Sequence, residues 1–188
     1  MLRFTPAVLA LALALPAAAD EFTDTLESAL EAYRAGDISG ARADLDYAGK
    51  LLTSLKSEAL AKFLPAALPG WTRGEASDED AAAAGGFMGM LGGGTSAAAT
   101  YTKEAQSLTI TLVADSPMVS GLGAMVSGMA GLTGGKPMRV QRTEFTDQDG
   151  SLQGVVNKRV MVSVSGDASV EDKKAFLEAM DFEALGEF

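Results

Sequence analysis

Residues 108–113 read LTITLV, and this stretch decides the fold. Leu108, Ile110 and Leu112 alternate with two threonines and a valine, which is the period-two pattern of a β-strand with one face turned inward. Residues 160–165, VMVSVS, repeat the alternation further along the chain, with the valines on one face. The sequence therefore predicts a sheet that is buried on one side.

Shorter signals on both sides of this stretch predict the rest of the sheet. Strands are expected at residues 71–75, 97–103, 138–145, 152–156 and 159–166. Turn-forming residues at 147–150 separate the strands expected at 138–145 and 152–156. An amphipathic helix is expected at 117–132. Ser169 is expected to cap a final helix whose first turn, including Lys173, is exposed.

This order of elements predicts an α+β fold: a helical hairpin, then a mainly antiparallel sheet with an inserted amphipathic helix and a C-terminal helix. The order over about residues 69–185 resembles the Mog1/PsbP-like fold, an antiparallel sheet layered between helices. That fold hosts no single function, so the resemblance transfers no site.

Apolar residues at helical spacing predict the hairpin at residues 20–68. In the first helix they are Phe22, Leu26, Ala29, Leu30 and Tyr33. After the break at Gly36-Asp37, steps of three and four residues form one stripe: Ile38, Ala41, Leu45, Ala48, Leu52, Leu55 and Ala59. The link between the helices is short, so they are expected to lie antiparallel.

The hairpin at about residues 26–55 resembles one tetratricopeptide repeat, because an aromatic residue and Gly-Asp precede Ala41, Leu45 and Ala48. Such repeats normally stack, and one copy makes no peptide-binding groove. The stripe is therefore expected to pack on the chain's own sheet domain or, alternatively, on a second protein or subunit.

The first 19 residues have the form of a secretory signal peptide. Arg3 precedes an apolar run of about a dozen residues, which is too short to span a bilayer, and residues 17–19 fit a small-residue cleavage pattern. Cleavage is expected after Ala19, which would leave a periplasmic or secreted protein without a stable membrane anchor. The sheet domain is expected at 69–188, with a flexible Gly/Ala/Met-rich loop at 76–96.

Composition excludes several classes of function. The chain has no Cys and no His, so disulfides, common zinc sites and His-dependent catalytic units are ruled out. A formal net charge of −10 argues against binding to nucleic acid or anionic lipid. No catalytic motif is present, and a carboxylate-dependent hydrolase is kept only as a second alternative, since no acidic pair stands out.

Two segments rich in Gly and Met carry the candidate sites. The flap Phe87, Met88, Met90 and Leu91 lies among glycines, and the expected helix at 117–132 supplies Leu122, Met125 and Met129. These residues predict a surface for a partner or an apolar ligand. Alternatively, Met88, Met90, Met125 and Met129 bind Cu(I), because thioether sulfur is a soft ligand; otherwise no cofactor is expected.

The sequence as a whole predicts an exported, acidic, non-enzymatic binding protein. Its partner would be an envelope protein or an apolar small molecule, and handling of Cu(I) is the alternative. The identity of the partner and the oligomeric state are left open by the residues alone.

Overall fold

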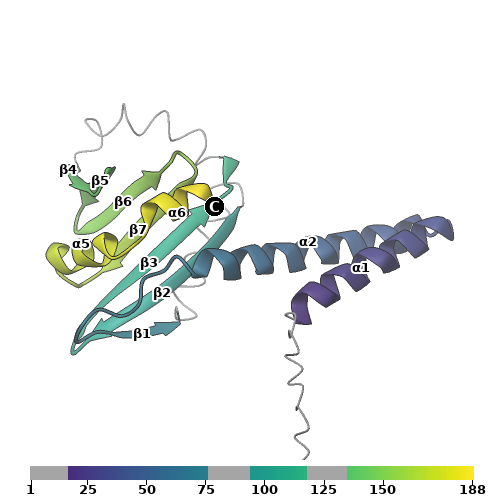
Figure 1. Cartoon of the computed structure of the whole chain (residues 1–188), viewed down its shortest axis with the longest axis horizontal. Helices are drawn as coiled ribbons and strands as arrows, with labels where there is room; N and C mark the ends of the chain where they lie inside the picture. The colour runs from purple at the N-terminus through teal and green to yellow at the C-terminus, as the bar shows by residue number, and fades with distance from the viewer. Residues whose placement is uncertain (1–16, 76–93, 118–134) are drawn as a thin grey trace, which may run out of the picture. The chain divides into compact units, whose positions relative to one another are not determined.

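The computed structural model describes residues 17–75, 94–117 and 135–188. Its contacts divide the chain into two compact units, Met1–Leu55 and Lys56–Phe188. The fold is α+β, with two N-terminal helices, a seven-stranded antiparallel sheet and C-terminal helices (Figure 1).

The first unit is a helical hairpin. Helix α1 spans Ala17–Arg34, and α2 spans Ile38–Ala61, of which the residues up to 55 belong to this unit. The predicted break is confirmed: Gly36 has a φ of 83°, and the Asp37 carboxylate accepts the Gly40 N–H at 2.9 Å, which caps α2. Helix α1 continues across the position where leader cleavage is expected.

The second unit contains the last part of α2 and the sheet. Its strands are β1 Thr72–Glu75, β2 Thr95–Lys103, β3 Gln106–Ala114, β4 Lys136–Val140, β5 Thr143–Gln148, β6 Ser151–Val156 and β7 Val160–Gly166. The strand order is β1-β2-β3-β7-β6-β5-β4, and every neighbouring pair is antiparallel. The stretch LTITLV lies in β3, near the centre of this order.

Two boundaries differ from the sequence prediction. The single strand expected at 138–145 is two strands, because the chain reverses at Gln141-Arg142 and Val140 pairs with Thr143. Gln141 has a φ of 53° without being Gly, Asn or Asp, so the turn has no sequence signal. The loop expected at 76–96 ends earlier, since β2 already begins at Thr95 and pairs with Ala114.

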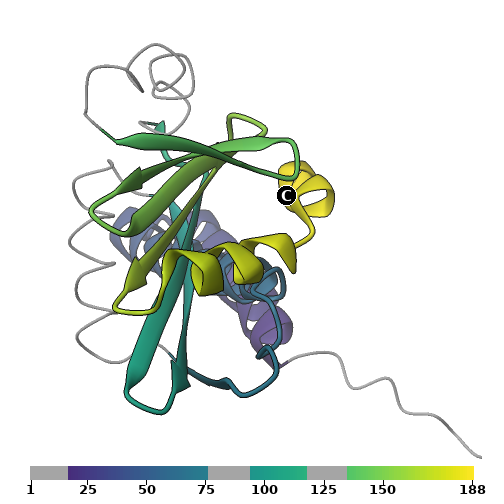
Figure 2. The ribbon, with the colours of Figure 1, turned by 90° about the vertical axis from the view of Figure 1, so that its left-hand side faces the viewer.

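Helices α5, Val170–Glu178, and α6, Phe182–Glu187, cover one face of the sheet (Figure 2). The predicted cap is confirmed, because the Ser169 hydroxyl accepts the Asp172 N–H at 3.1 Å. Phe176 of α5 contacts the rings of Trp71 and Tyr101, at centroid distances of 5.3 and 4.5 Å. Leu60 and Leu64 join the same core, so the end of α2 belongs to the sheet unit.

Lys173 corrects the expectation of an exposed first helical turn. Its side chain is 1% exposed, and its ammonium donates to the backbone oxygens of Gly150 at 2.6 Å and Gly166 at 2.7 Å. Burial lowers the pKa of Lys173, while Asp147 and Asp167 act in the opposite direction. Lys173 therefore ties α5 to the β5–β6 turn and to the end of β7.

The expected inserted helix at 117–132 falls almost wholly outside the described residues. None of the helices in the described ranges is both long enough and apolar enough to cross a lipid bilayer.

Candidate functional site

The described part of the hairpin pairs its helices through small residues. Ala29 of α1 is 4% exposed, and Ala41 and Ala48 of α2 are 6% and 2% exposed. A larger apolar residue one or four positions further along the same helix is exposed in each case: Leu30, Leu45 and Leu52. The hairpin thus buries small members of its apolar pattern and leaves six of the large ones exposed.

The uncovered residues share one side of the hairpin. Rotation by about 100° per residue places Leu26, Leu30 and Tyr33 within about 100° of Ala29, all in the same direction. The same rotation places Ile38, Leu45 and Leu52 to one side of Ala48. In an antiparallel pair these two directions coincide. We call the set the hairpin face: Leu26, Leu30, Tyr33, Ile38, Leu45 and Leu52.

Polar contacts occupy the opposite side. The Ser28 hydroxyl donates to Asp44 at 2.8 Å, and the Tyr47 hydroxyl donates to Glu21 at 2.7 Å. The hydrogen bond to the Glu21 carboxylate raises the pKa of Tyr47. Both bonds are exposed and join α1 to α2 on the side away from the hairpin face.

The hairpin face gathers six exposed apolar residues on one side of the helix pair. Its members are 38–64% exposed, with Tyr33 and Ile38 at the upper end of that range. Single exposed apolar residues are ordinary, whereas a contiguous group on one element is typical of an interaction site. Ile38, Leu45 and Leu52 recur every seven residues, which is the spacing by which helices pack on other helices.

The candidate site residues predicted from the sequence lie in segments that the structure does not describe. Phe87, Met88, Met90, Leu91, Leu122, Met125 and Met129 all lie outside the described residues. The apolar-ligand and Cu(I) hypotheses therefore stay predictions. Within the described ranges, no group of three or more Asp and Glu side chains is arranged to hold a metal ion.

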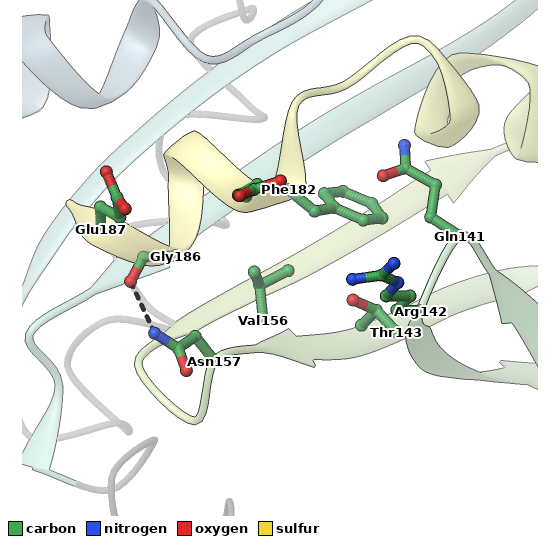
Figure 3. A pocket seen from close by; sticks show the side chains of 9 residues that line it. Gln141, Arg142, Thr143, Val156, Asn157, Phe182, Gly186 and Glu187 are labelled. Carbon is green, nitrogen blue, oxygen red and sulfur yellow. Dashed lines mark hydrogen bonds between the residues drawn. The ribbon is translucent and has the colours of Figure 1, made fainter.

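A hollow of about 540 Å³ lies beside α6 in the second unit. Figure 3 shows Phe182 and Val156 between the Gln141–Thr143 turn and Asn157. The two side-chain amides are occupied: Gln141 donates to the Met180 oxygen at 2.8 Å, and Asn157 donates to the Gly186 oxygen at 2.9 Å. These bonds hold the C-terminal helices on the sheet, so the hollow marks a structural junction.

Sequence reasoning found the stripe of α2 and missed how it divides. Ala41 and Ala48 turn toward α1, while Ile38, Leu45 and Leu52, from the same stripe, stay exposed. Residue size is the signal that separates them, because only small side chains allow two helices to approach closely.

Comparison with protein-family models, with curated proteins and with solved structures finds no match to this chain.

Proposed function

We propose that this chain is an exported, non-enzymatic interaction protein whose hairpin face binds an apolar helical stripe on a protein partner. The observation that carries the proposal is the hairpin face itself, six large apolar side chains on one side of a helix pair. Burying a Leu or Ile side chain completely contributes about 1.5–3 kcal/mol.

A helical partner fits the spacing of the hairpin face. Leu26, Leu30 and Tyr33 follow steps of four and three residues, and the α2 members repeat every seven. Both are patterns by which side chains of one helix fit between those of another. Apolar surface alone does not account for this spacing, so a helix is a better occupant than a small apolar molecule.

Site-specific photocrosslinking in the cells that make the protein tests this function. A photoreactive residue at Leu45 is expected to give an adduct with a protein partner, identified by mass spectrometry. Tyr47 provides the control, because it lies two residues further on, on the opposite side of the helix, and is 46% exposed against 56% for Leu45. Adducts only within the chain, or equal adducts from both positions, would contradict the proposal.

Export is the second part of the proposal. The leader-like residues 1–19 support it, and they predict that the processed protein begins at Asp20. Cell fractionation followed by N-terminal sequencing is the measurement; a chain that keeps Met1 and stays in the cytoplasm would show that the leader is not used.

A further inference from the structure

We infer that the occupant of the hairpin face is a second copy of this chain, and that two hairpins pack face to face as a four-helix bundle. The inference rests on the proposed function, because it names the partner of the same surface. It is carried by the charges around the hairpin face and by the direction in which the remaining acids point.

The rim of the hairpin face is balanced in charge. Helical rotation places Glu27 and Arg34 of α1, and Arg42 and Asp46 of α2, next to the apolar residues or just behind them. All four side chains are exposed, and none of them forms an ion pair within the described residues. Two acids and two bases make a rim that complements itself, which is what a two-fold symmetric contact requires.

Three of the other acids of the hairpin point away from the hairpin face. Residues 20–55 contain eight acids and three bases. Among the acids, Glu21 and Asp44 lie on the polar side, where they accept the bonds from Tyr47 and Ser28, and Asp24 also rotates to that side. The repulsion that these three acids cause between two copies is therefore directed away from the surface at which the copies would meet, and salt screens the rest.

The spacing of the apolar residues suits four helices. Helices with small crossing angles pack through residues at alternating steps of three and four or at every seventh position. In each hairpin, α1 supplies a row of the first kind and α2 a row of the second. The alanines already join α1 to α2 in one copy. The large apolar residues then form the contact between two copies. The alanines thus pack α1 on α2 within one hairpin, and the larger residues pack one hairpin on the other.

Sedimentation equilibrium of the processed chain, purified at micromolar concentrations, tests the inference. The expected mass is twice that of one chain. Leu52→Lys is expected to give a monomer, because it places a charge inside the bundle. Tyr47→Lys is the matched control: the positions are 45% and 46% exposed, the charge change is equal, and Tyr47 lies on the polar side beside Glu21. The control is expected to remain dimeric.

The absence of native Cys allows a second, independent readout. A pyrene attached at Leu45→Cys is expected to show excimer emission, which is lost on dilution with unlabelled chain, while pyrene at Tyr47→Cys is expected to show none. Helical content by circular dichroism checks that each variant folds.

The outcomes separate the inference from the proposed function. A wild-type chain that is monomeric throughout the concentration range and gives no excimer overturns the second copy as occupant. If crosslinks from Leu45 in cells then reach a different protein, the proposed function stands alone. If those crosslinks reach only the chain's own sheet unit, both fall.

Discussion

Gly154 illustrates how one core residue depends on its cross-strand neighbour. It pairs with Phe145, and a Cβ at position 154 would lie 2.7 Å from the Phe145 ring. Phe145 in turn stacks on Phe182 of α6, with centroids 5.7 Å apart. The ring occupies the space that a side chain at 154 would need.

Gly154→Ala is therefore expected to lower the free energy of unfolding by about 1–3 kcal/mol, the usual cost of overpacking a core. Chemical denaturation followed by tryptophan fluorescence measures it, since Trp71 lies in the same core. Gly74→Ala is the control in the same sheet: the added Cβ meets only the Thr100 backbone oxygen, at 3.9 Å, which is an ordinary contact. Equal effects of the two variants would contradict the steric explanation.

Asp115 is one residue whose charge state ties stability to pH. Lys56 lies within salt-bridge distance of its carboxylate, and Arg159 lies 3.6 Å away. The hydrogen bond from Lys56 is the main cause of a lowered Asp115 pKa. The unfolded chain thus binds a proton near pH 3.8, and the folded chain binds it only at lower pH.

The stability that Asp115 contributes is accordingly present above about pH 4 and lost as the pH falls through the folded pKa. Asp115→Asn is expected to make the free energy of unfolding less dependent on pH below 4, with a modest loss at pH 7 because the group is partly exposed. Urea titrations at several pH values measure this; parallel pH profiles for wild type and variant would be the contrary result.

At the scale of elements, β4 is an edge strand within the part of the chain that the structure describes. Val140 and Thr143 close the β4–β5 turn, so alternation directs the backbone groups of Pro137 and Arg139 toward the open edge. Pro has no N–H to donate, and Arg keeps its charge at that edge. Both residues discourage pairing with a strand of another molecule.

Pro137→Thr is expected to raise the rate of aggregation on mild heating, because it restores a donor and favours strand pairing. Light scattering during a temperature ramp is the measurement. Pro69→Thr makes the same exchange at an exposed position before β1, outside the sheet, and is expected to behave as wild type. A rise in scattering for both variants would point to a general loss of stability.

At the scale of the whole molecule, pairing through the hairpin face couples stability to concentration. A dimer is favoured by mass action, so the melting temperature of the hairpin helices is expected to rise as protein concentration increases. Leu52→Lys is expected to abolish that dependence and Tyr47→Lys to preserve it. Thermal melts followed by circular dichroism over a hundredfold range of protein concentration measure this dependence. A melting temperature of the wild-type chain that does not change with concentration would contradict the pairing of two hairpins.

Local patterns in the sequence determined the α+β class, the helical hairpin and most of the strands. The sequence patterns predicted the structure correctly where a few neighbouring residues determine it. Examples are the strand at 108–113, the break between the helices at Gly36 and the helix cap at Ser169. These features depend on neighbours in sequence, and elementary periodicity is enough to find them.

Tertiary structure alone decided which members of a pattern are buried. Lys173 is enclosed because the β5–β6 turn and the end of β7 bring two backbone oxygens to its ammonium group. The stripe of α2 divides because packing buries Ala41 and Ala48 and leaves Ile38, Leu45 and Leu52 exposed. Burial depends on partners distant in sequence, so residue type and spacing identified the apolar residues of the hairpin, and packing determined which of them remain available to another molecule.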